Sequence, residues 1–405
     1  MMQFRTPCLS AHLDSFCRKL DELCGLDFVY AEPPSEMRRR IGCRTDAAYR
    51  NGPITPENTE RAKNVELLYD MLREVDLFEA RAKKGLKTVY ASERWFKPIR
   101  IVRLFGLFDC SIPGWCRILV PGYWRMARRF ARLMDDPNFH VFAIGVHAVR
   151  DFVRMYRIFH GDWRSLFREP EVGIERKLGG AVEGFPRMWL WAYFVEKKGT
   201  GNGEQGTGNG EEKILKILWV GRMLNWKRVD TLIRAFKRVS KVRSAALLLV
   251  GEGPERRRLE KLAGADRVVA DALEWQEGKI VFHDYVRNDV ARELMRRADV
   301  YVMPSGGEEG WGAAVSEALS EGCPVLSTHE AGSSATLLPE ECLFSAGDAA
   351  ELADRLLRFK GEPVGYDAAA WGGEAAAEEL YINHRTRPGR RAEVNSGIFV
   401  LSKSV

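Results

Sequence analysis

Four charged side chains in the second half of the chain have the types and spacing to bind a phosphorylated substrate. Glu309 lies in a Gly-rich turn, and Glu317 follows eight residues later inside a predicted helix. Arg222 and Lys227 stand five residues apart in an earlier turn, where both can converge on one diphosphate. Arg binds phosphate oxygens through two parallel hydrogen bonds, and Lys binds them as a point charge. The carboxylates can accept hydrogen bonds from hydroxyls of the same ligand, such as those of a ribose near Glu317.

Backbone groups of the Gly-rich turn complete this candidate site. A short apolar strand is predicted at 299–303, and the turn leads from it into a helix at about 312–320. The first turn of a helix carries unpaired N–H groups at the positive end of the helix dipole, which suits a diphosphate. The residues at this position are Gly310, Trp311, Gly312 and Ala313.

This segment resembles the donor-binding signature of retaining glycosyltransferase family 4, whose members have the GT-B fold. The signature has two glutamates separated by seven residues, matched here by Glu309 and Glu317, with the run Gly310-Trp311-Gly312 between them. The resemblance implies transfer of a sugar from a nucleotide-diphosphate sugar with retention of anomeric configuration. It also implies that Glu309 holds sugar hydroxyls and Glu317 holds the ribose.

Three further turns of the second half match the same family. Gly221, Arg222 and Lys227 match its G-R-x-x-x-x-K element, and Gly251 with Gly253 matches the G-x-G-P turn that borders the nucleotide. His283 ends the next predicted strand, where the base lies in the family. A nicotinamide dinucleotide site is excluded, because its fingerprint needs a glycine where Arg256 stands.

The chemistry expected at this site is stabilisation of a leaving group. Breaking a sugar–phosphate bond develops negative charge on the nucleoside diphosphate, which Arg222, Lys227 and the helix N-terminus can stabilise. The sequence has no D-x-D element, so we expect a metal-independent reaction with no cofactor. Walker A, G-x-S-x-G and H-E-x-x-H motifs are also absent from the sequence.

Composition places the chain among ordinary globular proteins. It has 405 residues, 45% hydrophobic and 29% charged, which favours two or three domains. Its 8 cysteines form no C-x-x-C pair and read as reduced thiols. The first ten residues lack the layout of an export signal, and no apolar run reaches the ~18 residues of a membrane span. We therefore expect a cytoplasmic protein. The expectation includes peripheral contact with the inner face of the membrane.

The domain organisation expected is α/β, with two Rossmann-like doubly wound domains facing each other across a cleft. Residues 1–198 would form the acceptor-side domain. Residues 199–212 contain the hexapeptide Gly-Thr-Gly-Asn-Gly-Glu written twice and would be a flexible linker. Residues 213–362 would bind the nucleotide sugar, and residues 363–405 would form a C-terminal helix, crossing back to the first domain, and a basic tail.

The expected elements of the first domain begin with a strand at 3–9, a helix at 10–23 and a strand at 27–31. A loop at 33–56 and a helix at 58–74 follow, and then strands at 87–91, 139–146 and 187–196. In the second domain, strands are expected at 214–220, 245–250, 279–283, 299–303 and 323–328. Its helices are expected at 228–239, 254–263, 289–298, 312–320, 349–359 and 368–380.

Three residues of the first domain are candidates for the acceptor side. His12 follows the first strand, where the loop faces the cleft in GT-B enzymes, although a surface histidine at a helix start is an alternative. Glu93 and Arg94 end a strand in a run that resembles the "SER-x-FK" element of capsular-polysaccharide-type bacterial glycosyltransferases. A salt-bridged strand end is the alternative for that run. The segment Trp191-Ala-Tyr-Phe194 also resembles the capsular type.

A basic and aromatic stretch spans residues 94–133. It contains nine Arg or Lys residues and one acidic residue, Asp109, with aromatic side chains interleaved. This composition suits the surface of an anionic membrane. Two alternatives remain. The stretch could form a pair of core helices with solvated arginines, or it could be a nucleic-acid surface, although no recognised binding motif accompanies it.

These observations together predict a glycosyltransferase acting on a cell-surface polysaccharide, such as a capsule, or on its lipid-linked precursor. Its partners would be a nucleotide-diphosphate sugar donor, a glycan or lipid-linked acceptor and an anionic membrane surface, without nucleic acid. Two alternatives remain open: a nucleotide-sugar-binding protein without turnover, and a nucleotide-sugar isomerase.

Overall fold

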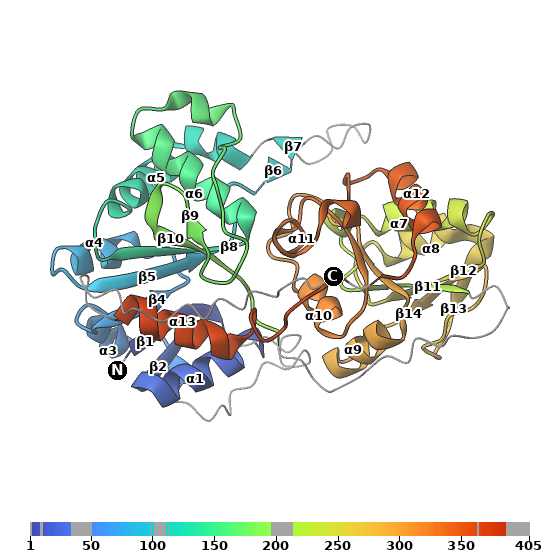
Figure 1. Ribbon diagram of the computed structural model, residues 1–405, viewed down its shortest axis with the longest axis horizontal. Coiled ribbons are helices and arrows are strands. Elements are labelled where there is room, and N and C mark those ends of the chain that lie inside the picture. Colours follow the sequence, from blue (N-terminus) through green and yellow to red (C-terminus); the bar gives the residue numbers. More distant parts are fainter. Residues whose placement is uncertain are drawn as a thin grey trace, which may run out of the picture.

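The computed structural model describes residues 2–8, 11–33, 51–97, 99–100, 111–112, 114–195, 214–362 and 364–385. These residues form two α/β units, each built on a mainly parallel sheet with helices above and below it (Figure 1). The predicted α/β fold class is confirmed. The predicted linker at 199–212 lies outside the described residues.

The first unit contains an 8-stranded sheet in the order β3-β2-β1-β4-β5-β8-β10-β9. Only the pairing of β9 with β10 is antiparallel among its described strand pairs. Its strands are β1 Met2–Cys8, β2 Leu26–Glu32, β3 Asn51–Pro53, β4 Leu67–Asp70, β5 Lys87–Ser92, β8 Phe139–Ile144, β9 Ala181–Val182 and β10 Phe185–Trp191.

Helices of the first unit pack their apolar faces on this sheet. In α1, for example, Phe16, Cys17 and Leu20 are buried in one cluster with residues of β1 and β2, as their helical spacing predicts. The helices are α1 Asp14–Cys24, α3 Pro56–Ala62, α4 Val75–Ala82, α5 Pro121–Leu133 and α6 Val146–Phe159, with short 3-10 turns η1 Ala11–Leu13, η2 Gly114–Leu119 and η3 Trp163–Leu166. The strands β6 Ile99–Arg100 and β7 Ser111–Ile112 form a separate small hairpin.

The second unit contains a 7-stranded parallel sheet in the order β13-β14-β12-β11-β15-β16-β17. Its strands are β11 Leu215–Val220, β12 Ala245–Val250, β13 Arg267–Val269, β14 Ile280–His283, β15 Val300–Met303, β16 Val325–Thr328 and β17 Leu343–Phe344. Its helices are α7 Val229–Val239, α8 Arg256–Ala263, α9 Asn288–Arg297, α10 Ala313–Ser320, α11 Gly332–Leu337 and α12 Ala349–Arg358. All six residues of β12 are buried, as expected of a parallel strand covered on both faces.

One predicted element of the first unit is wrong. The helix expected at 58–74 is in fact the short helix α3, which ends at Ala62, followed by the strand β4. Residues of β4 are buried on both faces and pair with β1 and β5 in the middle of the sheet. An apolar strand buried on both faces lacks the alternation that separates strand from helix in a sequence. The predicted loop at 33–56 also contains a strand, β3, and α4 was not predicted.

The last described helix, α13 Gly373–Arg385, returns to the first unit and lies on α1 (Figure 1). Ala376, Ala377 and Leu380 are buried there, and Lys19 and Glu378 form an ion pair at 3.5 Å. This confirms the predicted crossing helix, which begins at Gly373 and not at 368.

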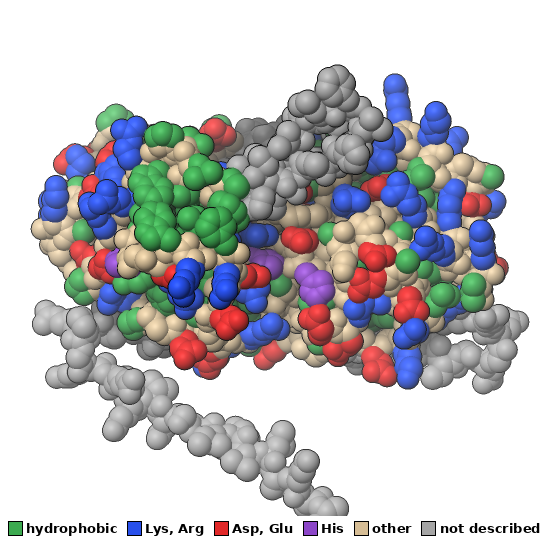
Figure 2. All heavy atoms as spheres, turned by 90° about the horizontal axis from the view of Figure 1, so that it is seen from above, with side chains coloured by type: hydrophobic (Ala, Val, Ile, Leu, Met, Phe, Trp, Pro, Cys, Tyr) green, Lys and Arg blue, Asp and Glu red, His purple; other side chains and the backbone are tan. Residues whose placement is uncertain are grey.

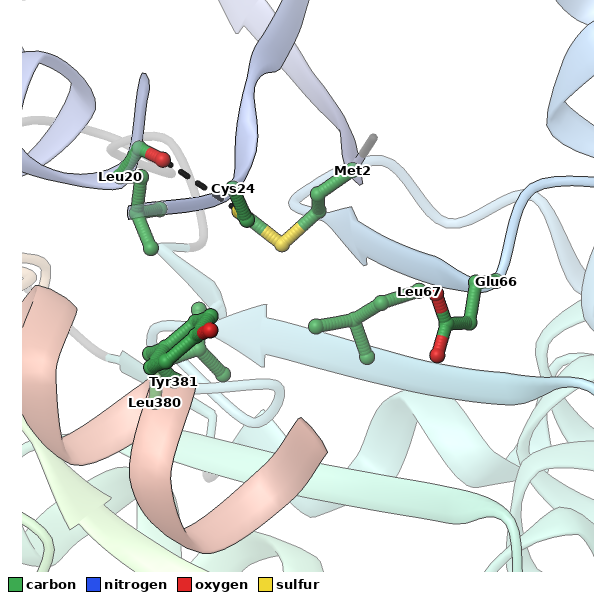
Figure 3. Close-up of a pocket in the computed structure, with 7 residues that line it drawn as sticks. All are labelled: Met2, Leu20, Cys24, Glu66, Leu67, Leu380 and Tyr381. Carbon is green, nitrogen blue, oxygen red and sulfur yellow. Dashed lines mark hydrogen bonds between the residues drawn. The ribbon is translucent and has the colours of Figure 1, made fainter. Parts of the chain in front are cut away.

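A small apolar pocket lies beside α13, where Leu380 and Tyr381 face Met2, Leu67 and α1 (Figure 3). It sits at the amino ends of β1 and β4. The polar candidate residues lie at the opposite, carboxyl edge of the sheets, so this pocket contributes nothing to the candidate site.

Within the described ranges, no helix is both long enough and apolar enough to cross a membrane.

Candidate functional site

The predicted donor residues lie on loops that follow the carboxyl ends of β11, β12 and β15. Backbone hydrogen bonds join these loops: Met223 N–H donates to the Glu252 carbonyl at 2.7 Å, and Gly306 N–H donates to the Trp226 carbonyl at 2.6 Å. Ligands of open parallel sheets bind at this edge. The structure therefore brings the separately predicted motifs together.

Lys227 and Glu309 form an ion pair between the loops after β11 and β15. Their side chains are 22% and 13% exposed, so water screens the pair only partly. Each residue neutralises and positions the other.

Arg222 is the first residue of this loop after Gly221, and its side chain is exposed. Among the described residues, no carboxylate lies within ion-pair distance of it. Its guanidinium is thus available to a ligand bound beside Lys227.

Glu317 lies on α10, and its Oε1 accepts a hydrogen bond from Asn288 Nδ2 at 2.8 Å. Asn288 is the first residue of α9. Asn288 is not predictable from the sequence, because an Asn at a helix start is common and its partner is 29 residues away.

The turn after β12 is held tightly against the turn after β11. A Cβ on Gly251 would lie 1.9 Å from the Gly221 carbonyl oxygen, so no side chain fits there. Arg256 Nη1 donates to the Gly251 carbonyl at 2.7 Å and to the His283 carbonyl at 2.9 Å. The residue that excludes the dinucleotide fingerprint therefore joins two loops of this site, a role that its place in the sequence did not reveal.

The two ring nitrogens of His283 lie 2.9 Å and 3.0 Å from the carbonyl oxygens of Asp284 and Asp271. These contacts hold the imidazole beside the carboxyl end of β14.

Glu93 of the first unit reaches the Gly-rich turn of the second. Its Oε1 accepts a hydrogen bond from Trp311 N–H at 3.3 Å. A Cβ on Gly310 would lie 2.1 Å from Glu93 Oε2, so the glycine allows the carboxylate to approach. Burial acts to raise the pKa of Glu93, but Lys97, Tyr193 and the Trp311 N–H outweigh burial and lower it. The carboxylate therefore stays ionised near neutral pH.

Trp311 contributes its backbone to this turn. Its indole is 1% exposed and donates from Nε1 to Ser316 Oγ at 3.0 Å. A donor could therefore contact the backbone of Trp311 but not the indole. Gly312 follows as the residue before α10, which begins at Ala313.

The other acceptor-side candidates lie near Glu93. His12 stacks on Tyr193 with ring centroids 6.4 Å apart, and Tyr193 lies edge-on to Trp311 at the same distance. Arg94 lies 3.9 Å from Asp151 and from Glu330 of the second unit. The carboxyl edge of the first sheet thus faces the donor loops.

A second contact between the units was not predicted. Thr336, on the unpredicted helix α11, accepts a hydrogen bond from Val146 N–H at 3.1 Å. His147 Nε2 lies 2.7 Å from the His329 carbonyl oxygen. Since a carbonyl can only accept, this nitrogen carries a proton. Burial, aided by the positive charge of Arg94, lowers the pKa of His147 to about 4.

The basic and aromatic stretch divides into two kinds of residue. Trp95, Phe96 and Phe130 are buried in the core of the first unit, and Arg129 is paired with Asp76 and Glu79. The core interpretation is confirmed for the three aromatic residues, whereas Arg129 is ion-paired and not a solvated arginine. Leu119 and Val120 are 71% and 56% exposed, and residues 98, 101–110 and 113 lie outside the described ranges.

Solved structures similar to this chain are glycosyltransferases of the GT-B type. HepE of Anabaena, solved with UDP, aligns with a TM-score of 0.54 and 14% identity over 94% of both chains. The lipopolysaccharide outer core galactosyltransferase WaaB aligns with a TM-score of 0.54 and 13% identity over 95% of this chain and 97% of that one. The protein therefore has the GT-B fold.

Sequence similarity to known proteins lies in the second unit. Residues 215–360 match the family model of Glycosyl transferases group 1. A 2-deoxystreptamine glucosyltransferase of Streptomyces kanamyceticus is 31% identical over 170 residues, 41% of this chain and 42% of that protein. An uncharacterized glycosyltransferase of Methanocaldococcus jannaschii is 34% identical over 113 residues, 27% of this chain and 26% of that protein. The matches thus cover less than half of either relative.

Proposed function

We propose that this protein is a glycosyltransferase that moves a sugar from a nucleotide-diphosphate sugar to an acceptor held on the first unit. The observation that supports this most is the ion pair of Lys227 with Glu309, beside Arg222 and opposite Glu93. A UDP-sugar is the first donor to test, because HepE was solved with UDP.

In this proposal the second unit activates the leaving group. Negative charge develops on the nucleoside diphosphate as the sugar–phosphate bond breaks. Arg222, Lys227 and the N–H groups at the start of α10 would stabilise that charge, and Glu317 would hold the ribose. These two cations can supply the neutralisation for which other glycosyltransferases use a metal ion. We extend the proposal to a metal-independent, retaining reaction on the basis of the family 4 resemblance.

Glu309 would turn from Lys227 to the hydroxyls of the donor sugar once a diphosphate binds Lys227. The exchange replaces one charge partner of Lys227 by another, so the lysine stays paired throughout. Glu93 keeps the turn at Gly310 in place from the other side. Donor binding and the contact between the units would thereby be coupled.

The acceptor would be a cell-surface polysaccharide, such as a capsule, or its lipid-linked precursor. The support for this part is the resemblance of the run Ser92-Glu93-Arg94 and of Trp191-Ala-Tyr-Phe194 to the capsular type.

A membrane surface would then be a partner of the first unit. Leu119 and Val120 are exposed, as are Trp163 and Phe167 at 51% and 77%. Trp163 stacks on Trp124 at 5.5 Å, and Phe167 lies edge-on to Trp115 at 5.6 Å. We call Leu119, Val120, Trp163 and Phe167 the apolar patch. Figure 2 shows hydrophobic side chains gathered on this face of the first unit. Arg125 and Arg128 of α5 are exposed nearby in sequence and could meet anionic headgroups.

Incubation with UDP-sugars labelled in the sugar, with and without a lipid extract, separates this proposal from its alternatives. Transfer predicts acceptor-dependent release of UDP and a labelled product without nucleotide. An isomerase would leave the label attached to UDP in a new sugar, and a binding protein would leave the UDP-sugar unchanged.

A further inference from the structure

A pocket of about 320 Å³ lies at the carboxyl edge of the first sheet, next to Glu93. Its lining includes four cationic side chains and one described carboxylate, that of Glu93. The cationic residues are Arg73, Arg94, Lys97 and Arg117. Lys97 pairs with Glu93 at 2.7 Å, and Arg94 has Asp151 and Glu330 as distant partners at 3.9 Å, so the charges of Arg73 and Arg117 in particular are left for other partners.

Arg73 and Arg117 have no carboxylate within ion-pair distance among the described residues. The guanidinium of Arg73 stacks over the ring of Trp95 at 4.6 Å, which fixes it at the pocket wall. Burial raises the pKa of Tyr123 to about 12, while Arg73 and Arg117 both act to lower it. Arg73 and Arg117 therefore both place positive charge near the Tyr123 phenol.

Arg94 is the most enclosed of the three arginines. Its side chain is 16% exposed, and its Nε and Nη1 are buried with no hydrogen-bond partner in the described structure. The carboxylates of Asp151 and Glu330 are each 3.9 Å away, beyond hydrogen-bond distance. A buried donor without an acceptor is unfavourable, so a small rearrangement toward an anion in the pocket would be favoured.

We propose that this pocket binds a phosphate group of the acceptor substrate, with Arg73, Arg94 and Arg117 as its ligands. The inference rests on the proposed function and specifies its acceptor. A phosphate ester carries up to two negative charges at neutral pH and matches several guanidinium groups better than a single carboxylate does. Its source is either a lipid phosphate or a water-soluble phosphate ester.

The same charges fix the direction of the acceptor in the pocket. Glu93 is ionised and repels an anion, and it accepts a hydrogen bond from the backbone of the Gly-rich turn. The phosphate would therefore sit on the side of Arg73 and Arg117. The uncharged, hydroxyl-bearing end would point to Glu93 and the donor loops, where the new glycosidic bond has to form.

Titration calorimetry with glycerol phosphate, on enzyme saturated with UDP, tests this proposal without turnover. UDP would occupy the loops of Arg222 and Lys227, so any glycerol phosphate that binds has to bind elsewhere, and the measured binding can be attributed to the first unit. We expect binding that weakens with salt and no binding of glycerol. Arg73→Ser and Arg117→Ser should each weaken binding by roughly tenfold or more, the scale of one charge-assisted hydrogen bond.

Arg176→Ser is the matched control, because it removes an exposed arginine of the same unit outside the pocket. It should bind the probe as the wild type does. Arg94→Lys keeps the charge near Asp151 and should fold, but it should bind more weakly because lysine lacks the fork of donors.

A second arm distinguishes the two sources. UDP-saturated enzyme is mixed with vesicles that contain phosphatidic acid, and glycerol phosphate is added as competitor. Release of the vesicles by glycerol phosphate, lost in Arg73→Ser, identifies a pocket that also accepts lipid phosphates. If the vesicles stay bound in the presence of glycerol phosphate, the pocket is limited to water-soluble phosphate esters, and the vesicles bind to another surface of the protein.

Failure of the wild type to bind glycerol phosphate at low salt would overturn the inference, as would equal binding by Arg73→Ser, Arg117→Ser and the wild type. UDP affinity in the same experiment reports the proposed function separately. If UDP does not bind, glycerol phosphate binding is compared between Arg73→Ser and Arg222→Ser. A loss in Arg73→Ser alone supports the pocket, and a loss in Arg222→Ser alone rejects it.

Discussion

Lys227 and Glu309, which the sequence predicts as a phosphate ligand and a sugar ligand, form an ion pair with each other. If Lys227 binds the diphosphate as proposed above, the diphosphate has to compete with Glu309 for it, and we expect the pair to weaken the binding of a nucleotide that brings no sugar to occupy Glu309. The proposed roles of Lys227 and Glu309 can therefore be tested separately, by measuring UDP binding and turnover in variants of each residue.

Glu309→Gln should bind free UDP as tightly as the wild type or more tightly, because Lys227 loses its competitor. Its kcat should fall if the contact of Glu309 with the sugar tightens in the transition state. Glu317→Gln should mainly weaken the binding of the donor, because Glu317 would hold the ribose in the ground state and in the transition state alike. Calorimetry and steady-state kinetics measure both effects. A loss of kcat alone, equal in the two variants, would contradict these roles.

The approach of Glu93 to Gly310 should appear as coupling between the two positions. Gly310→Ala places a Cβ 2.1 Å from Glu93 Oε2 and should destabilise the protein by ~1–3 kcal/mol, the usual range for overpacking. Glu93→Ala removes the obstructing carboxylate. In urea denaturation, the double variant should therefore be more stable than the sum of the single changes predicts. Additive effects would show that the two residues do not touch.

His147 should make the protein less stable in mild acid. Its pKa is lowered to about 4 from an ordinary value of 6.5, so the unfolded chain takes up a proton before the folded chain does. Its contribution is complete above about pH 6.5 and is lost as the pH falls toward 4, on the order of 3 kcal/mol in all.

His147→Gln keeps a donor for the His329 carbonyl but does not titrate. Its melting temperature should fall less than that of the wild type between pH 7 and 5. His140 provides the background in both proteins, because burial lowers its pKa to about 3. Parallel pH profiles for wild type and variant would refute the role of His147.

The apolar patch should carry membrane association. Trp163→Ser with Phe167→Ser should reduce cosedimentation with anionic vesicles, because both side chains are more than half exposed. Arg125→Ser and Arg128→Ser should weaken it further and increase its sensitivity to salt, at ~1 kcal/mol for each charge. Donor affinity should not change. Arg129→Ser should instead lower stability, because Arg129 is paired with Asp76 and Glu79. Wild-type protein that ignores anionic vesicles at low salt would rule out this surface.

The sequence predicts the second unit more fully than the first for a physical reason. Its strands are largely apolar runs, and its loops carry Gly251, where the backbone of Gly221 approaches closely, and Gly310, where the Glu93 carboxylate does. In the first unit, β4 has four buried residues between helices and no alternating pattern, so the sequence does not distinguish it from a helix.

Long-range pairings could not be predicted from local patterns. The bond of Glu93 to Trp311 joins residues 218 positions apart, and that of Val146 to Thr336 joins residues 190 apart. No periodicity or turn signal encodes such a partner. The pocket of Arg73 and Arg117 was missed for the same reason, because its arginines come from different loops.

Acceptor-dependent release of UDP from a UDP-sugar, measured for the wild type and for Arg222→Ala and Lys227→Ala, tests the central claim most directly. We expect release by the wild type and a loss of ~2–4 kcal/mol in transition-state stabilisation for each variant, the scale of one preorganised donor. Arg238→Ala, an exposed change on α7, is the control and should leave the rate unchanged. Arg222→Ala should also fold normally, because its side chain is exposed. Two results would contradict the proposed glycosyltransferase activity and its site. One is a wild-type rate in both Arg222→Ala and Lys227→Ala, and the other is no release of UDP from any UDP-sugar in the presence of a lipid extract.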